Sequence, residues 1–158
     1  MGFLSSFFRF MPVMPVFFLV FAASPLWSQA ETEQGRPDDP VSYVGLTLNE
    51  LIGRFGTPSW VYAARGLEEW QDDVVFVYNA GDFYIFRDRV WQVGLKAARG
   101  INSGDSRAVV SLVLGSQAVD LGNSTFYPLD DGSWPLMLRY DYDSAGKVQA
   151  IFIYRTDM

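Results

Sequence analysis

Two stretches of the chain share one pattern of glycines and apolar residues, and this repetition constrains the fold more than any other feature. The stretches are GLTLNELIGRFG at residues 45–56 and GDSRAVVSLVLG at residues 104–115. When they are aligned on their glycines, Leu51 falls on Val110, and each half then continues into sequence rich in β-forming residues. We therefore interpret the chain as containing two copies of a repeated unit of roughly 50 to 60 residues.

The first stretch carries the signals of a short helix with a defined start and end. The run TLNE at residues 47–50 matches a capping box, and Gly56 suits a left-handed C-terminal cap. The second copy, AVVSLVL at residues 108–114, is rich in β-branched residues and could alone be a strand. We assign it to a helix because the equivalent segment is one. Apolar residues at the i, i+3, i+4 and i+7 spacing of one helix face support the first helix, namely Leu48, Leu51, Ile52 and Phe55.

Each half is expected to continue into antiparallel strands joined by short turns. From residue 136 onward, apolar residues alternate with Met137, Arg139 and Asp141, which predicts one buried face and one wet face. The fold class is therefore α+β, with two tandem repeats, each a short helical segment packed on one face of an antiparallel β-meander of about three to four strands. The expected strands span residues 74–78, 83–87, 90–95, 124–127, 136–142 and 148–155.

A short helix that ends in an apolar residue, Gly, any residue and Pro, followed by a glycine, an aromatic residue and a β-meander, resembles the BLIP/SmpA-OmlA superfamily. GLTLNELIGRFGTP and the meander from Trp70 to Val93 carry the resemblance in the first half. GDSRAVVSLVLG and YDYDSAGKVQAIFIY carry it in the second half. The resemblance implies a scaffold that binds other proteins through a sheet face or loops, without catalysis. Its lipoprotein members need a cysteine and its inhibitor members use disulfides, so neither specific role carries over to this cysteine-free chain.

Residues 1–30 have the three parts of a secretory signal peptide. A short start containing Arg9 precedes an apolar run at residues 10–23, and the small residues Ser28 and Ala30 fit a cleavage site. The run is shorter than the about 20 apolar residues that span a membrane. We therefore expect cleavage after Ala30 rather than a retained anchor.

The rest of the chain is expected to divide into three parts. Residues 31–42 are polar and contain prolines, which predicts a flexible N-terminus. Residues 43–98 form the first α+β repeat and residues 99–158 the second. We expect an exported protein, periplasmic or extracellular, with no membrane span after cleavage and no lipid anchor.

The chain contains no cysteine and no histidine, which excludes several kinds of chemistry. A disulfide, a thiolate metal site and a Ser-His-Asp triad are impossible. Acidic residues outnumber basic ones by 18 to 12, and the basic residues are scattered along the chain. Nucleic acid is therefore not expected as a partner, because phosphate contacts need clustered Lys and Arg. No metal and no cofactor is expected.

Three motifs that resemble functional sites are interpreted as structural. The glycine spacing matches neither GxxxxGK[ST] nor GxGxxG. The run DYDSAG at residues 141–146 begins like a calcium loop, but Ala145 and Phe152 occupy ligand positions, so we expect a hairpin turn with Gly146 at positive φ. Paired acids could serve a glycosidase, but adjacent acids on a loop are more often solvated surface. These pairs are Glu68-Glu69, Asp72-Asp73 and Asp130-Asp131.

The tryptophans and tyrosines supply the candidate binding site. Most are expected in the core, and the remainder would form an anchor patch on the uncovered sheet face, because Trp, Tyr and Arg dominate binding hot spots. By strand parity Trp91 is in register with Gln149, a polar position, so Trp91 is expected to face outward. Tyr84 and Arg139 are the further candidates. Burial of Trp91 beneath the helices would contradict this hypothesis.

We therefore expect an exported, non-enzymatic module that binds proteins or supports the cell envelope. Its expected partner is another envelope or secreted protein. One alternative is a small-ligand or glycan-binding domain that uses the same aromatic residues. A more remote alternative is a hydrolase that uses carboxylates alone. The sequence does not predict the oligomeric state.

Overall fold

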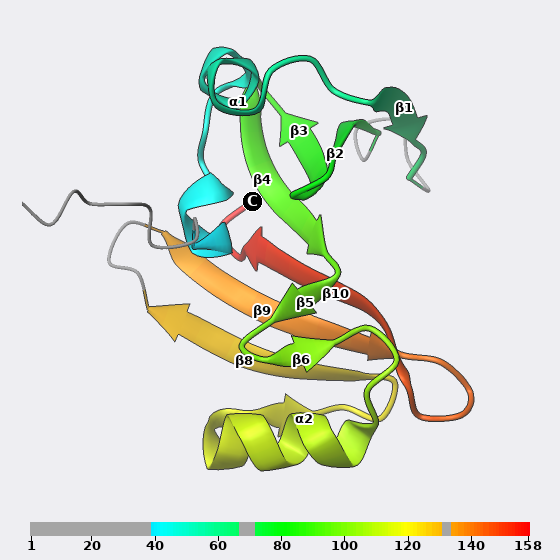
Figure 1. Cartoon of the computed structure of the whole chain (residues 1–158). Helices are drawn as coiled ribbons and strands as arrows, with labels where there is room; N and C mark the ends of the chain where they lie inside the picture. The colour runs from blue at the N-terminus through cyan, green and yellow to red at the C-terminus, as the bar shows by residue number, and fades with distance from the viewer. Residues whose placement is uncertain (1–38, 67–71, 131–133) are drawn as a thin grey trace, which may run out of the picture. The chain divides into compact units, whose positions relative to one another are not determined.

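The computed structural model describes residues 39–66, 72–130 and 134–158 (Figure 1). Within these ranges, no helix is long and apolar enough to cross a membrane. A 3-10 helix, η1 (Pro40–Tyr43), opens the described chain and is capped by the side chain of Asp39. Outside the described residues lie the predictions for residues 1–30 and 31–38, for Glu68-Glu69, for Trp70 and for Asp131.

The described chain is built on one eight-stranded antiparallel sheet, in the order β1-β2-β3-β4-β10-β9-β8-β7. The strands of each half are neighbours in chain order, and β4 pairs with β10 where the two halves meet (Figure 1). The strands are β1 (Trp60–Ala64), β2 (Asp73–Tyr78), β3 (Gly81–Phe86), β4 (Arg89–Leu95), β7 (Val119–Asp120), β8 (Ser124–Asp130), β9 (Pro135–Tyr142) and β10 (Val148–Arg155). A short separate hairpin consists of β5 (Ala97–Ala98) and β6 (Ile101–Asn102).

Both predicted helices are present, as α1 (Leu48–Phe55) and α2 (Arg107–Leu114), the latter followed by the 3-10 helix η3 (Gly115–Gln117). Thr47 and Glu50 form the predicted capping box at the start of α1. Each helix ends at a glycine with positive φ, 77° at Gly56 and 65° at Gly115. Glycine is favoured there because a Cβ strains this backbone conformation.

The two helices pack on the same face of the sheet. One residue from each of the four central strands β3, β4, β10 and β9 marks this face. The four residues are cross-strand neighbours, and all are buried in one hydrophobic core. Leu51 of α1 and Val110 of α2 are fully buried in the same core. The removal of these apolar side chains from water is the main favourable term for this layer. The four neighbours are Phe83, Val93, Ile153 and Leu138.

Helices on one face of an antiparallel sheet confirm the predicted α+β class.

Backbone hydrogen bonds join the segment before each helix to the last strand of the same half of the chain. The N–H of Gly45 donates to the carbonyl of Val90 at 2.8 Å, and the N–H of Gly104 donates to the carbonyl of Val148 at 2.7 Å. In each half the valine N–H donates at 2.8 Å to the carbonyl of the residue that follows the glycine. Both glycines have φ above 90°.

Several details differ from the sequence predictions. The strand β1, the strand β7 and the β5–β6 hairpin were not predicted. β5, β6 and β7 have two residues each, and β1 is apolar throughout, so none of them shows the alternation that marks a strand. The turn predicted at Asp88-Arg89 lies one residue earlier, where Arg87 and Asp88 have φ of 48° and 67°. The strand β4 accordingly begins at Arg89.

Candidate protein-binding face

The face of the sheet that points away from the helices carries a row of aromatic side chains. Successive residues of a strand point to opposite faces, so the neighbours of the core residues Phe83 and Ile153 belong to this side. Cross-strand pairs extend it from β1 at one edge to β8 near the other. We call this surface the aromatic face and define it by Trp60, Tyr62, Tyr84, Trp91, Phe126, Arg139, Phe152 and Tyr154.

Phe152 of β10 joins Tyr84 of the first half to Arg139 of the second. The rings of Tyr84 and Phe152 are 6.2 Å apart between centroids, with an interplanar angle of 74°. The guanidinium carbon of Arg139 lies 4.7 Å from the Phe152 centroid, and its Nε lies 3.1 Å from Oδ1 of Asp141. The Phe152 ring also covers Gly94, where an added Cβ would lie 3.4 Å from the ring. Cation–π and aromatic contacts therefore hold the guanidinium against the sheet.

Trp91 reaches the aromatic face through a shift of register between β3 and β4. Ile85 pairs with Val90 and Tyr84 pairs with Gln92, which leaves Trp91 as an extra residue on β4. Such a bulge re-aims a side chain relative to strict alternation. Trp91 is only partly buried. It is not covered by the helices, which was the finding that would have contradicted an outward-facing Trp91.

The indole N–H of Trp91 donates to Oδ1 of Asp73 at 3.0 Å. Partial burial raises the pKa of the Asp73 carboxyl above its ordinary value of 3.8, against the lowering effect of this hydrogen bond. The negative charge of the neighbouring Asp72 raises it further. Asp72 itself forms an ion pair with Arg65. The two adjacent acids thus have separate partners within the strand region.

The β1–β3 part of the aromatic face is packed tightly enough to bury apolar side chains. Val75 lies opposite Tyr62 and Tyr84 and is fully buried, although it lies outside the core beneath the helices. Burial raises the pKa of Tyr84 to about 12, with smaller contributions from the Tyr62 hydroxyl and from the charges of Asp82 and Asp73. Tyr84 is therefore neutral at physiological pH and acts as a hydrogen-bonding aromatic residue.

The structure brings all three predicted binding residues to one face. Tyr84 and Arg139 are joined through Phe152, and Trp91 lies on the neighbouring strand, held by Asp73. Sequence reasoning missed Phe152, Tyr154, Tyr62 and Trp60 as members of this surface. Alternation along the strand from Val148 was the available signal, since Phe152 and Tyr154 share the parity of Ala150 rather than that of the buried Ile151.

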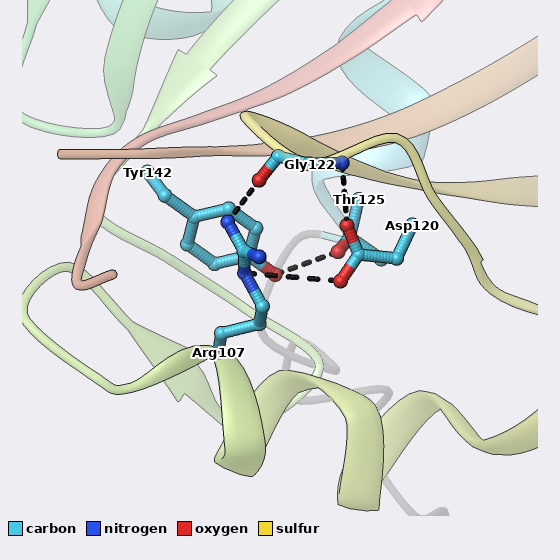
Figure 2. A network of polar contacts seen from close by, with 5 residues as sticks. All are labelled: Arg107, Asp120, Gly122, Thr125 and Tyr142. Atoms are coloured by element: carbon cyan, nitrogen blue, oxygen red, sulfur yellow. Dashed lines mark hydrogen bonds and ion pairs between the residues drawn. The ribbon is translucent and has the colours of Figure 1, made fainter. Parts of the chain in front are cut away.

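A second polar cluster fixes the start of α2 against the sheet (Figure 2). The Arg107 guanidinium lies 4.6 Å from the Tyr142 ring centroid, its Nε lies 3.7 Å from Asp120, and an NH2 group donates to the Gly122 carbonyl. The Tyr142 and Thr125 hydroxyls are hydrogen-bonded at 2.7 Å in the interior. These contacts connect α2 with β7, β8 and β9, and Arg107 Nε makes only the ion-pair contact with Asp120, with no hydrogen bond within the described residues. The arrangement supports the fold and offers no nucleophile next to a base.

The DYDSAG run forms the predicted hairpin turn between β9 and β10. Asp143 Oδ1 accepts the backbone N–H groups of Ala145 and Lys147, both at 2.9 Å, and Gly146 has φ of 70°. An Asp side chain that caps its own turn is typical of such hairpins. Across the described ranges, no three His, Cys, Asp or Glu residues are grouped so that they could hold a metal ion.

A shallow hollow of about 510 Å³ lies beside Arg139 at the border of the aromatic face. Ser124, Asp141 and Gln149 are among the residues that line it with Arg139. The Ser124 hydroxyl donates to Asp141 Oδ1 at 2.6 Å, so Asp141 accepts a hydrogen bond from Ser124 and also forms the ion pair with Arg139. The lining is mostly polar, and Tyr142 is its aromatic member.

Comparison with known proteins gives no family assignment: no protein-family description and no curated protein matches the chain. Solved structures that are similar to it include the following two. One is an extracellular protein containing a SCP domain from Bacillus anthracis str. Ames, with 13% identity, a TM-score of 0.49, and 82% of this chain and 49% of that chain covered. The other is a cysteine-rich secretory protein from Staphylococcus aureus subsp. aureus Mu50, with 12% identity, a TM-score of 0.45, and 77% and 48% covered. The chain thus spans about half the length of either structure.

The expected membership of the BLIP/SmpA-OmlA superfamily is contradicted by this comparison, in which the similar structures are SCP-domain and cysteine-rich secretory proteins. The motifs that carried the resemblance were helix caps and hairpin turns. These motifs follow from local backbone requirements, such as positive φ at Gly56, and recur in unrelated folds. They therefore identified helices and turns without identifying a family.

Proposed function

We propose that this protein is an exported, non-enzymatic module that binds another envelope or secreted protein through the aromatic face. The observation that carries the proposal is the set of aromatic side chains that, together with Arg139, extends across both halves of the sheet on the face opposite the helices. Trp60 and Tyr62 at one end of this row expose 67% and 39% of their surface. Trp, Tyr and Arg are the residues that contribute most to protein–protein binding energy.

The chemistry of the aromatic face favours recognition over catalysis. Arg139 stacks on Phe152 and pairs with Asp141, so the cation is held in one orientation and presents a flat, partly apolar surface. Tyr84 stays protonated because its pKa is about 12, so it is a weak base for proton abstraction. A rigid surface of this kind loses little side-chain entropy when a partner binds.

We further propose that the chain is a tandem duplication of one α+β unit. The matched bridges Thr47–Arg89 and Ser106–Lys147 support it, because each connects a helix N-cap to the residue before a core valine. The strand order, in which β1–β4 and β10–β7 run toward each other, also supports it. A duplicated unit joined through its last strands gives one sheet with a broader face than either unit alone.

The export part of the proposal rests on residues 1–30, whose charge, apolar run and small residues fit a signal peptide. N-terminal sequencing of the protein recovered from the periplasm or the medium tests it. We expect the mature chain to begin at Glu31. A chain that keeps Met1 and stays with the membrane fraction would contradict cleavage.

Affinity capture from the envelope and medium of the host tests the binding proposal. The wild type is compared with Tyr154→Ala, on the aromatic face, and with Leu112→Ala, a residue of α2 that is 84% exposed on the helix side. We expect the wild type and Leu112→Ala to retain one partner protein in fixed ratio and Tyr154→Ala to lose it. Equal retention by Tyr154→Ala, with its fold intact by circular dichroism, would contradict the assignment of the face.

Glycan or small-ligand binding is the second candidate, favoured by the hollow beside Arg139. Aromatic rings next to hydroxyl, carboxylate and amide groups are the elements that bind a sugar. Titration of tryptophan fluorescence with neutral and acidic sugars distinguishes the candidates. A saturable change that Arg139→Ala abolishes, together with no captured protein, would favour this second function.

A further inference from the structure

Within the described sheet, β1 is an apolar edge strand whose own residues carry no feature that blocks pairing. Its sequence is Trp-Val-Tyr-Ala-Ala, and it lies at one end of the strand order of the described sheet. Trp60 and Tyr62 point to the aromatic face, whereas Val61, which is 46% exposed, points to the helix side opposite Phe76. Natural proteins usually blunt an edge strand with charges, proline or a bulge. β1 has none of these between Trp60 and Ala64.

The opposite edge of the same sheet is blunted in the usual ways. β7 has only two residues, Val119 and Asp120, and Asp120 is charged. The part of β8 beyond β7 contains Pro128, which has no N–H to donate, and ends at the charged Asp130. Since one edge is protected and the other is not, the exposed apolar character of β1 is a specific property of that strand.

We propose that two copies of this chain pair antiparallel through β1, with Tyr62 opposite Tyr62 of the second copy. In this register all five residues of the strand are paired. Trp60 lies opposite Ala64 and Val61 opposite Ala63, so each large side chain faces a small one. Arg65 falls opposite Ser59, so no like charges meet. A strand of this length can pair with itself in other registers, but those leave Trp60 or Ala64 without a partner.

The pairing has a consequence for the aromatic face. Directly paired residues in an antiparallel sheet point to the same side, so Trp60 and Tyr62 of both copies lie on one continuous surface. The two-fold axis passes through Tyr62 perpendicular to the sheet, which makes the contact isologous and closed at two copies. The dimer therefore carries an aromatic face twice as wide, independent of what that face binds.

Matched charge insertions at the two edges test the pairing. Val61→Lys places a cation on β1, and Val119→Lys places the same cation on β7, where the side chain is 54% exposed. Molar mass is measured by light scattering on the protein purified as its host exports it. We expect dimers for the wild type and for Val119→Lys, and monomers for Val61→Lys. A monomeric wild type, or a Val61→Lys variant that stays dimeric, overturns the proposal.

Cross-linking tests the register in a way that does not depend on weakening the contact. The chain contains no cysteine, so Tyr62→Cys introduces one thiol, which the two-fold axis brings next to its copy. Paired Cβ atoms lie about 5 Å apart, close enough for a disulfide after small adjustment. We expect mild oxidation to give a covalent dimer with Tyr62→Cys and none with Val119→Cys. Equal yields from both variants would indicate random collision and overturn the register.

Two outcomes separate this proposal from the proposed function. Val61 lies on the helix side of β1, so Val61→Lys does not change the aromatic face itself. In one outcome the wild type is monomeric and Val61→Lys no longer captures the partner protein. That result would mean that β1 pairs with a strand of another protein, and it overturns pairing with a second copy. Capture that survives in Val61→Lys and is lost in Tyr154→Ala leaves the two proposals independent.

Discussion

Trp91 and Asp73, on strands β4 and β2, are joined by a hydrogen bond of 3.0 Å from the indole N–H to the carboxylate. Strict alternation would place one of the adjacent residues Trp91 and Gln92 on the helix side. The extra residue in β4 releases Trp91 from that alternation, and Asp73 holds it on the aromatic face. A local irregularity thus decides which surface this tryptophan joins.

We expect the hydrogen bond between Trp91 and Asp73 to make tryptophan fluorescence depend on pH. The pKa of Asp73 is raised above 3.8, mainly by burial, so the folded state holds the proton more tightly than the unfolded chain. The proton on Asp73 therefore stabilises the folded state. This stabilisation is fully present below pH 3.8 and is lost as the pH rises through the pKa that Asp73 has in the folded protein. We expect a fluorescence transition with a midpoint above 3.8. Asp73→Asn should abolish it and Asp82→Asn should leave it, and a transition that survives in Asp73→Asn would exclude Asp73 as its source.

The two helix N-caps give a matched pair of variants. The Thr47 hydroxyl oxygen accepts a hydrogen bond from the Glu50 N–H, and the Glu50 carboxylate accepts one from the Thr47 N–H. The Ser106 side chain makes no capping hydrogen bond. Thr47→Ala should therefore lower the free energy of unfolding by about 1 kcal/mol. Ser106→Ala should change it by less than about 0.5 kcal/mol. Urea unfolding measures both, and equal losses would contradict the difference in capping.

Arg107 should be more important for stability than its exposed position suggests. Arg107→Ala removes the stacking on Tyr142, the bond to the Gly122 carbonyl and the ion pair with Asp120 (Figure 2). We expect a loss of about 1 to 2 kcal/mol. Hydrogen exchange should accelerate in β7 and α2 more than in β1–β3. A uniform increase over the whole sheet would argue against a local clamp.

Two glycine substitutions should have opposite signs. A Cβ added at Gly81 would lie 2.5 Å from the carbonyl oxygen of Gly94, and this backbone neighbour cannot move without breaking the β3–β4 pairing. Gly81→Ala should cost about 2 kcal/mol or more. Gly53 lies within α1 with open space around its Cβ position, so Gly53→Ala should stabilise by about 0.5 to 1 kcal/mol. Thermal unfolding compares the two, and a stabilising Gly81→Ala would contradict the close approach.

Phe152 should support the centre of the aromatic face. Phe152→Ala uncovers Gly94 and removes the ring contacts of Tyr84 and Arg139. Because the side chain is only partly buried, we expect a loss of about 2 kcal/mol, below the range for a fully buried ring. Phe126→Ala serves as the comparison and should cost less, because Phe126 lies on the same face and makes no ring contact within the described part of the chain. Denaturant midpoints measure the difference.

Local signals predicted the helices and most strands because each depends on residues close in sequence. The capping box at Thr47, the glycines that end both helices and the alternation from Leu136 to Tyr142 are all short-range features. α2 is the informative case, since its β-branched sequence favours a strand. Its assignment as a helix came from comparison with the first half, and burial of Val110 and Leu114 against the sheet stabilises it.

The candidate site was predictable only in part. Strand parity predicted an outward Trp91, with Tyr84 and Arg139 as further candidates, but it predicted neither the bulge that places Trp91 nor the contact between the two halves, because β4 and β10 meet through pairing of residues about 60 positions apart. Phe152 gains its central position only from that pairing. The edge character of β1 was also invisible, since whether a strand has one neighbour or two depends on the whole sheet.

The sequence by itself determined the periodic and capping features of this protein: where helices begin and end, where hairpins turn, and which chemistries the missing cysteine and histidine exclude. These follow from backbone sterics and side-chain inventory, which act within a few residues. Only the tertiary structure decided that β4 pairs with β10, that Arg139 stacks on Phe152, and that β1 lies at one end of the described sheet. The reason is that these relationships are set by long-range strand pairing, whose register depends on burying both halves in one core at once.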